Sequence, residues 1–189
     1  MLSFRTTTLQ YFFVPLCLIL LASCASVTTN TNNTQAPTQT TLQLNNAAET
    51  NIRLGLYYLE QKNMQQAKTK LQLALQQSPE NFLAYDAMGY FWESIQETSL
   101  AEKYYQQAIK IVPTNGATHN NYGTFLYRQK RCDLALIQFK KALQDNNYLN
   151  LAGVYKNAAQ AALCLNDTKQ AQKYFDKVAL IAPQKKKED

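Results

Sequence analysis

The chain has 189 residues, which is room for one domain of moderate size and some accessory segments. Its formal net charge at pH 7 is +6, a modest surplus that does not indicate a nucleic-acid-binding module. The sequence has one histidine and no phosphate-binding glycine loop, which disfavours a metal cluster and histidine-dependent catalysis. We therefore expect no metal, cofactor, nucleic acid or small-molecule substrate, and no enzymatic activity.

Residues 1–23 have the features of a bacterial signal peptide. Arg5 precedes an apolar run, from Tyr11 to Leu21, that is too short and too poorly flanked for a stable membrane span. The run leads into the sequence Leu-Ala-Ser-Cys, which ends at Cys24 and resembles a lipobox. In a lipobox, small residues precede a cysteine that becomes acylated. The sequence therefore predicts lipidation at Cys24, and the alternative is an ordinary signal peptide or an uncleaved anchor that happens to end in cysteine.

The segment from Cys24 to about Ala47 is predicted to be a flexible tether. It is rich in Thr, Asn and Gln, and it contains no charged or aromatic residue. Such a composition cannot bury enough apolar surface to offset the entropy of ordering. Ala25 follows the cysteine directly, where an aspartate would suggest retention, and this resembles the sorting signal for the outer membrane of a Gram-negative cell. We expect a lipid-anchored protein that faces the periplasm.

A repeat with a period of 34 residues occupies positions 48–183. It shows in three glycines, three alanines and three large residues: Gly55, Gly89 and Gly123; Ala67, Ala101 and Ala135; Leu71, Tyr105 and Phe139. A fourth copy follows after a shift of 36, with Ala159 in the glycine position. Small residues at this period are typical of the tetratricopeptide repeat. We predict an all-α fold, a right-handed superhelix (α-solenoid) of four helix pairs, with units at about 48–81, 82–115, 116–151 and 152–183 and a basic tail at 184–189.

The small residues indicate close packing between the two helices of a unit. Glycine inside a helix costs about 1 kcal/mol relative to alanine, so a gain in packing is expected in return. We expect the first helix to approach the second at its alanine, and the large residue one turn later (Leu71, Tyr105, Phe139 or Phe175) to fill the seam. The residues 145–148 replace the expected proline between the third and fourth units and predict a longer turn there.

Cys132 and Cys164 fall at neighbouring places of the third and fourth units. Because the predicted compartment is oxidising, we expect a disulfide bond between them, and the alternative is two free, partly buried thiols. His119 is expected to serve packing or to lie at the surface.

The first helices of such arrays line a concave face. Register places these side chains on it: Ile52, Leu56, Leu59, Leu83, Asp86, Tyr90, Glu93, Asn120, Thr124, Tyr127, Lys156 and Gln160. The apolar members are concentrated in the first two units, and an exposed apolar strip usually marks a partner site. The alternative is that the tether or the end of the chain itself covers this strip.

Three segments carry a resemblance to a known family: NNYGTFLY at 120–127, QFKKAL at 138–143 and VYKNAAQAALC at 154–164. They resemble the type IV pilus biogenesis lipoproteins, the PilF/PilW pilotins. The resemblance implies a lipobox, a polar tether and a tetratricopeptide superhelix at the inner leaflet of the outer membrane, where the family helps its secretin to reach the membrane and form multimers. The family typically has six units, whereas this chain has four.

Three functions follow as hypotheses. The first is a pilotin whose partner is the secretin subunit of the type IV pilus. The second is a general periplasmic scaffold lipoprotein for outer-membrane assembly or cell-wall enzymes. The third, a cell-wall or redox enzyme, has little support.

Overall fold

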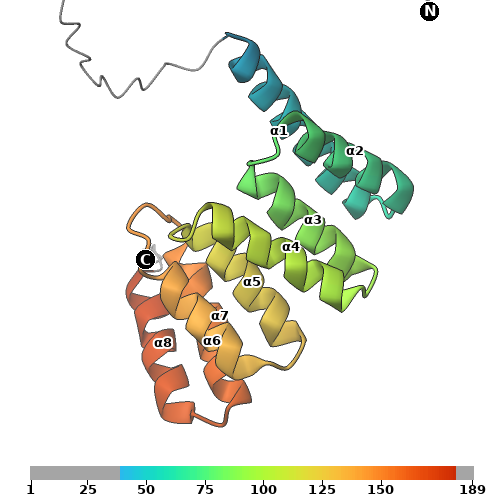
Figure 1. Ribbon diagram of the computed structural model, residues 1–189. Coiled ribbons are helices and arrows are strands. Elements are labelled where there is room, and N and C mark those ends of the chain that lie inside the picture. Colours follow the sequence, from blue (N-terminus) through green and yellow to red (C-terminus); the bar gives the residue numbers. More distant parts are fainter. Residues whose placement is uncertain (1–38, 182–189) are drawn as a thin grey trace, which may run out of the picture. The chain divides into compact units, whose positions relative to one another are not determined.

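The computed structural model describes residues 39–181, with side chains from residue 46 onward, and every regular element in that range is a helix (Figure 1). The helices are α1 (Gln39–Glu60), α2 (Met64–Gln77), α3 (Phe82–Ser94), α4 (Thr98–Ile111), α5 (Gly116–Arg128), α6 (Cys132–Ala142), α7 (Leu151–Cys164) and α8 (Thr168–Ile181). The predicted signal peptide, the lipidation site Cys24 and the basic tail lie outside the described residues.

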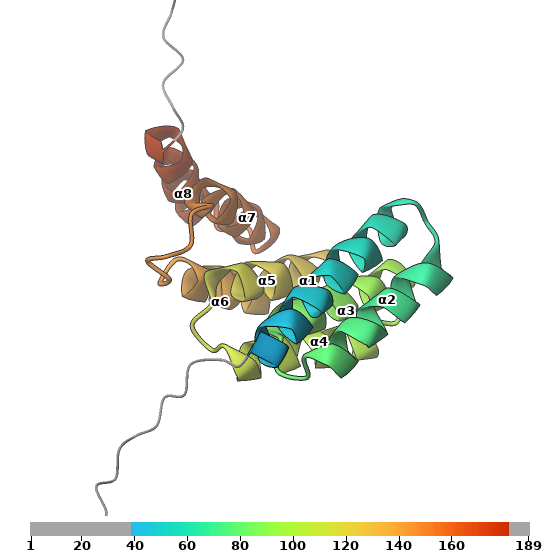
Figure 2. The same cartoon turned by 90° about the horizontal axis from the view of Figure 1, so that it is seen from above.

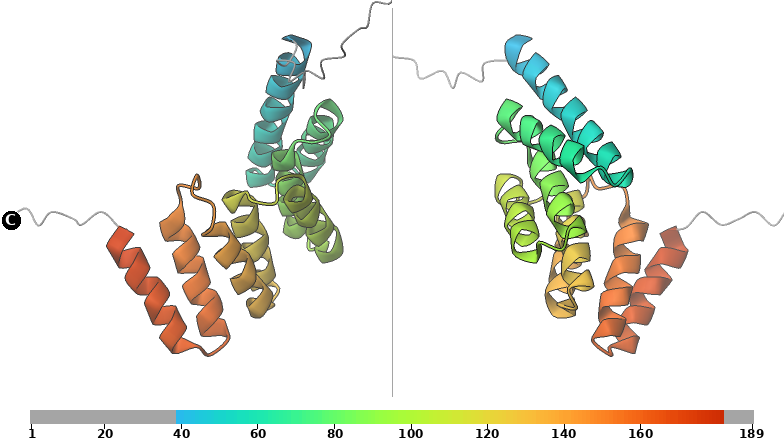
Figure 3. Two further views of the ribbon diagram at one scale, coloured as in Figure 1. Left: turned by 60° about the vertical axis from the view of Figure 1, so that its left-hand side comes forward. Right: turned by 90° about the vertical axis from the view of Figure 1, so that its right-hand side faces the viewer.

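The eight helices of this range pack as four antiparallel pairs, α1 with α2, α3 with α4, α5 with α6 and α7 with α8. Figures 2 and 3 show the pairs following one another in chain order. The first helices of successive pairs also contact each other, α1 with α3, α3 with α5 and α5 with α7. The prediction of an all-α fold made of four tetratricopeptide helix pairs is confirmed.

Helix α1 begins at Gln39, inside the segment that was expected to be tether. The prediction that flexible chain extends to Ala47 is therefore wrong for residues 39–47. These residues include Gln and Leu, which favour helix, and none of residues 38–47 is Gly or Pro. Extending an existing helix by such residues is much easier than starting a new one, so α1 runs past the boundary of the repeat.

Asparagine starts several of the helices. The side chains of Asn63, Asn81, Asn115 and Asn150 each accept a hydrogen bond from a backbone N–H of the first turn of the following helix. Such caps satisfy N–H groups that have no partner inside the helix. At the other end, Pro79 and Pro113 follow the C-caps of α2 and α4 directly, where proline cannot continue a helix.

The turn inside each pair is built the same way four times. Lys62, Gln96, Lys130 and Asn166 have φ angles of 57°, 64°, 61° and 60°, which is the left-handed region. In each turn the next residue's N–H bonds back to a carbonyl five positions before it, as in Asn63 to Tyr58 at 2.8 Å and Arg131 to Leu126 at 2.9 Å. This is the Schellman arrangement, and it reverses the chain after the first helix of every unit.

The repeated glycines lie directly against the large residues of the second helices. A Cβ atom added to Gly89 would lie 2.9 Å from the ring of Tyr105, and one added to Gly123 would lie 2.7 Å from the ring of Phe139. At Gly55 the nearest atom, 2.5 Å away, belongs to Leu71. The expected close approach is present, but its main partner is the large residue rather than the alanine one turn earlier.

Phe175 departs from the seam-filling role expected for it. Its side chain is 37% exposed, whereas Leu71, Tyr105 and Phe139 are buried. The reason is its place in the stack, because α8 is the last helix that the structure describes and no further described helix covers it.

The connection between α6 and α7, residues 143–150, is longer than those after α2 and α4, as the sequence predicted. It folds back onto the start of α5: Asp145 accepts a hydrogen bond of 2.7 Å from the Gly116 N–H, and Tyr148 packs against the core cluster that contains Phe139. The hydrogen bond from Gly116 also lowers the pKa of the Asp145 carboxyl. The two inserted residues are thus accommodated without separating α6 from α7, which remain in contact.

The structure also joins Cys132, at the start of α6, to Cys164, at the end of α7, in a disulfide bond with a Cα–Cα distance of 6.2 Å. This matches the pairing expected from the sequence and links the third unit to the fourth. Within residues 39–181, none of the helices has the length and apolarity needed to cross a membrane.

Candidate partner-binding groove

A cavity of about 640 Å³ opens between α1, α3 and α5, and we call it the groove. Its lining comes from these three helices and from one residue of α4: Ile52, Leu56, Leu83, Asp86, Ala87, Tyr90, Tyr105, Ala117, Asn120, Asn121, Thr124 and Arg128. The contacts between successive first helices, α1 with α3 and α3 with α5, place these residues around one space.

One wall of the groove is apolar. Ile52 and Leu56 of α1 stand beside Leu83, Ala87 and Tyr90 of α3. Leu83 and Tyr90 are 42% and 44% exposed, although both are large and apolar in character. An apolar wall with exposed side chains in a concave site is the usual mark of a surface that a partner covers.

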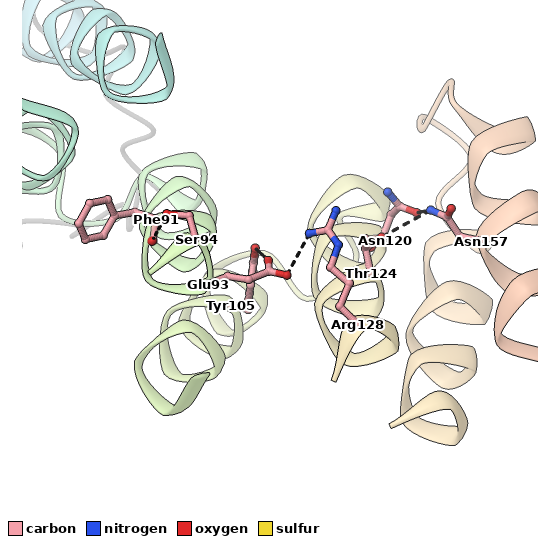
Figure 4. A network of polar contacts seen from close by, with 8 residues as sticks. All are labelled: Phe91, Glu93, Ser94, Tyr105, Asn120, Thr124, Arg128 and Asn157. Atoms are coloured by element: carbon pink, nitrogen blue, oxygen red, sulfur yellow. Dashed lines mark hydrogen bonds and ion pairs between the residues drawn. The ribbon is translucent and has the colours of Figure 1, made fainter. Parts of the chain in front are cut away.

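The opposite wall, on α5, is polar and is fastened to α3 by an ion pair. Arg128 lies 2.9 Å from Glu93, and Tyr105 of α4 donates a hydrogen bond of 3.1 Å to the other oxygen of the same carboxylate (Figure 4). Burial, together with the negative charge of Glu93, raises the pKa of the Tyr105 hydroxyl, so it stays protonated and remains a donor. Both oxygens of Glu93 are therefore engaged, and three helices meet at this carboxylate.

A second polar link joins α5 to α7. The Asn157 amide donates to the Asn120 side-chain oxygen at 3.0 Å and approaches the Thr124 hydroxyl at 3.5 Å (Figure 4). Thr124 in turn donates to the backbone carbonyl of Asn120 at 2.8 Å. These contacts fix the orientation of two groove residues, Asn120 and Thr124, by means of a residue of α7, which belongs to the fourth unit.

Asp86 is the most unusual residue of the groove. It is only 6% exposed, and one of its oxygens, Oδ2, accepts hydrogen bonds from Thr118 at 3.0 Å and from Asn121 at 3.4 Å. The other oxygen, Oδ1, is buried with no hydrogen-bond partner among the described residues. Burial raises the pKa of this carboxyl to about 6, against the lowering effect of the two hydrogen bonds.

The structure places seven of the residues expected on the concave face around the groove: Ile52, Leu56, Leu83, Asp86, Tyr90, Asn120 and Thr124. Ile52 and Asp86 were expected to project outward, but both are buried and form the floor of the groove rather than its exposed rim. They lie where α1, α3 and α5 come together, so neighbouring helices cover them. Glu93 stands at the edge of the groove, paired with Arg128.

Four other expected residues do not line the groove. Leu59 is buried in the same core cluster as Met88 and Phe91, because it lies near the end of α1, where α2 and α3 pack. Tyr127 packs against the core cluster that contains Phe139. Lys156 and Gln160 belong to α7, and no residue of that helix lines this cavity.

Five groove residues and one supporting residue were not anticipated. The sequence contained a pattern that could have predicted three of them. Ala117 lies 34 positions after Leu83, and Ala87 and Asn121 follow the expected Asp86 and Asn120 directly. Arg128 is the last residue of α5, and its role depends on Glu93, which sequence register alone does not pair with it. Tyr105 enters from a second helix, and Asn157 acts from behind the wall, so a rule based on outward positions of first helices misses both.

His119 takes no part in the groove. It is 2% exposed, and its two ring nitrogens lie 2.8 Å from the side-chain oxygen of Gln138 and 2.8 Å from the carbonyl of Pro113. The ring therefore ties α5 to α6 and to the preceding turn, which is a packing role. The side chains that the structure describes contain no group of three or more His, Cys, Asp or Glu arranged to hold a metal ion.

Comparison with known proteins agrees with this architecture. The tetratricopeptide repeat family pattern matches residues 48–81. The type IV pilus assembly protein PilF of Pseudomonas aeruginosa is 34% identical over 147 residues, which are 78% of this chain and 58% of PilF. An uncharacterized protein of Haemophilus influenzae is 34% identical over 116 residues, which are 61% of this chain and 65% of that protein.

Solved structures give the same result. The structure of Pseudomonas aeruginosa PilF superposes with a TM-score of 0.70 at 33% identity, over 73% of this chain and 62% of that one. The structure of PilW, a widely conserved type IV pilus biogenesis factor, superposes with a TM-score of 0.68 at 25% identity, over 72% of this chain and 63% of that one. The chain spans less than two thirds of the length of these relatives. It is a tetratricopeptide repeat protein homologous to the type IV pilus assembly protein PilF.

Proposed function

We propose that this protein is an outer-membrane lipoprotein that binds the secretin subunit of the type IV pilus and assists its membrane localisation and multimer assembly, as a pilotin does. The observation that carries the proposal is the groove, an apolar-walled site with exposed Leu83 and Tyr90 inside the region that is similar to PilF. The predicted lipobox at Cys24 supports the membrane attachment that such a function requires.

The groove suits a peptide segment of a protein partner better than a small substrate. It is open between three helices, and its lining offers no nucleophile paired with a base and no cluster of metal ligands. Burying one large apolar side chain is worth roughly 1.5–3 kcal/mol. Leu83 and Tyr90 are 42% and 44% exposed, so a segment that covers both gains part of this free energy at each, while the polar links at Glu93 and Asn157 keep the walls in place.

The proposal is tested by deleting the gene in its own host and measuring the secretin. We expect the ratio of secretin multimer to monomer in outer-membrane fractions to fall, and a plasmid copy of the full chain to restore it. Immunoprecipitation of the lipidated protein from detergent-solubilised membranes should recover the secretin subunit. Normal secretin multimers in the deletion strain would contradict the proposal and favour a general periplasmic scaffold for outer-membrane assembly or cell-wall enzymes.

A further inference from the structure

The oxygen Oδ1 of Asp86 is a buried acceptor that the described part of the chain leaves without a donor. The side chain is 6% exposed and lines the groove, so the unpaired oxygen belongs to a residue of the cavity that the proposed function assigns to a partner. Buried polar groups are nearly always hydrogen-bonded, and a buried carboxylate without compensation is costly. An acceptor without a donor on a residue that lines a cavity therefore indicates that a ligand supplies the donor, which an acceptor in a closed core does not.

The internal contacts of Asp86 do not explain why the residue is an acid. Thr118 and Asn121 both donate to the other oxygen, Oδ2, and an asparagine at position 86 could accept the same bonds without a charge. Burial raises the pKa of the carboxyl, and the hydrogen bonds from Thr118 and Asn121 offset only part of that effect.

Among the described residues, the groove is lined by one cationic side chain, that of Arg128, but this side chain already pairs with a carboxylate. Arg128 pairs with Glu93 at 2.9 Å, and Glu93 lies two helical turns from Asp86 on α3, about 10 Å along the helix axis. The negative charge of Asp86 is therefore not neutralised by the nearest ion pair. The groove offers a carboxylate without a cationic partner in the described chain, in the first half of α3, and a satisfied ion pair near the end of that helix, with Leu83, Ala87 and Tyr90 on the same helix.

We propose that Asp86 recognises a lysine or arginine side chain of the partner segment, whose neighbouring apolar side chains cover Leu83 and Tyr90. A cationic donor both fills the vacant acceptor and neutralises the buried charge, whereas a backbone N–H would fill the acceptor and leave the charge. The inference takes the groove as the partner site and so rests on the function proposed above. It adds the chemistry of the partner: a basic residue flanked by apolar residues.

The probe is a phage-displayed library of random 12-residue peptides, selected in parallel on the detergent-solubilised full chain and on its Asp86→Asn variant. Asp176→Asn is the matched control, because Asp176 on α8 is an exposed acid far along the chain from the groove. Only clones that lose binding to a Leu56→Asp variant are counted as groove binders. We expect the wild-type and control selections to enrich Lys or Arg beside apolar residues, and the Asp86→Asn selection to lose that enrichment.

Synthetic versions of the selected peptides give the quantitative test. Asp86→Asn should weaken binding at least about tenfold, and replacing the basic residue of the peptide by Met should weaken binding to the wild type by a similar factor. The two changes together should cost little more than either alone, since both remove the same contact. Groove-dependent peptides without basic residues, additive effects of the two changes, or an absence of groove-dependent peptides would each overturn the inference.

The outcome is distinguishable from failure of the proposed function. If the peptides depend on Asp86 but secretin multimers are normal in the deletion strain, the groove has the inferred chemistry and a different partner. If secretin multimers require the protein but peptide binding is indifferent to Asp86, the proposed function stands and the inference is wrong.

Discussion

The Thr118 hydroxyl on α5 donates a hydrogen bond of 3.0 Å to one carboxylate oxygen of Asp86 on α3, in the floor of the groove. This bond joins the first helices of the second and third units at a buried, acidic residue. It holds the two helices together and at the same time fixes a carboxylate that burial disfavours in its charged form. Burial therefore makes folding favour the protonated form of this side chain, whereas the partner recognition proposed above requires its charged form.

The Asp86 carboxyl should make the folded protein less stable as the pH rises. Its pKa is raised from 3.8 to about 6 in the folded state, so between these values the folded chain keeps a proton that the unfolded chain loses. The stabilising contribution is present below pH 4 and is lost as the pH passes 6. A shift of this size corresponds to roughly 3 kcal/mol.

The measurement is urea unfolding of the wild type and Asp86→Asn at pH 4 and pH 7. We expect the wild type to lose up to about 3 kcal/mol relative to the variant between these two values. The neighbouring groups Tyr105, Glu93 and Arg128 are common to both proteins, so the comparison isolates the effect of replacing the Asp86 carboxyl. A difference in free energy of unfolding that does not change with pH would contradict this account.

Gly89→Leu should damage folding, whereas Leu83→Ala should not. Even the first carbon of a side chain at Gly89 would meet the ring of Tyr105 at 2.9 Å, so a larger residue must displace a buried helix contact. Overpacking of this kind typically costs ~1–3 kcal/mol, while trimming the exposed Leu83 should change stability by about 0.5 kcal/mol or less. Thermal unfolding compares the two, and equal melting temperatures would show that the packing assigned to Gly89 is wrong.

Reduction of the bond between Cys132 and Cys164 should destabilise the protein without unfolding it at room temperature. The bond closes a loop with a sequence separation of 32 residues, for which the stabilisation is typically about 2–4 kcal/mol. Both thiols should resist alkylation of the unfolded chain until a reductant is added. Immediate labelling of both cysteines in freshly isolated, unfolded periplasmic material would mean that the bond does not form in the cell.

The residue Cys24 should determine membrane attachment. Cys24→Ala is expected to remove labelling by radioactive palmitate and to leave the protein unprocessed or released from the outer-membrane fraction. Cys17→Ala, in the predicted signal peptide, is the matched control and should be labelled as the wild type is. Continued labelling of Cys24→Ala would end the lipoprotein interpretation.

Sequence periodicity predicted the helix pairs because each repeated residue meets a steric demand that recurs in every unit. Gly55, Gly89 and Gly123 each face a large side chain at a distance that a Cβ atom would not allow. The left-handed turns at Lys62, Gln96, Lys130 and Asn166 follow the same spacing, but the sequence did not predict them. Three of these residues are Lys or Gln, which have no special preference for that conformation, so their identity gives no signal.

The sequence could predict only those features of the site that depend on which residues share one face of a single helix. Outward register placed Leu56, Leu83 and Tyr90 on the face where the structure has the groove, because the angular positions of residues around one helix follow from their spacing in the sequence. It misplaced Leu59, whose burial depends on how α2 and α3 pack at the end of α1. The vacant acceptor of Asp86 depends on which donors two other helices bring, and helix register in a single sequence does not contain that information.

The central claim is that the groove binds the secretin, and the most direct test is the double variant Leu56→Asp with Tyr90→Asp. Both side chains line the apolar wall, so two charges there should weaken binding by orders of magnitude. Leu56 also packs against the core cluster that contains Leu59, so the folding of the variant has to be measured beside its binding. Gln72→Asp with Gln76→Asp, at exposed positions of α2, is the matched control, and circular dichroism verifies folding.

The quantity measured is the ratio of secretin multimer to monomer in outer-membrane fractions of the deletion strain carrying each variant. The account predicts that the groove variant, although folded and present at normal levels, fails to restore multimers, while the α2 control restores them fully. Normal secretin multimers with a folded Leu56→Asp, Tyr90→Asp protein would contradict the claim that this groove is the secretin-binding site.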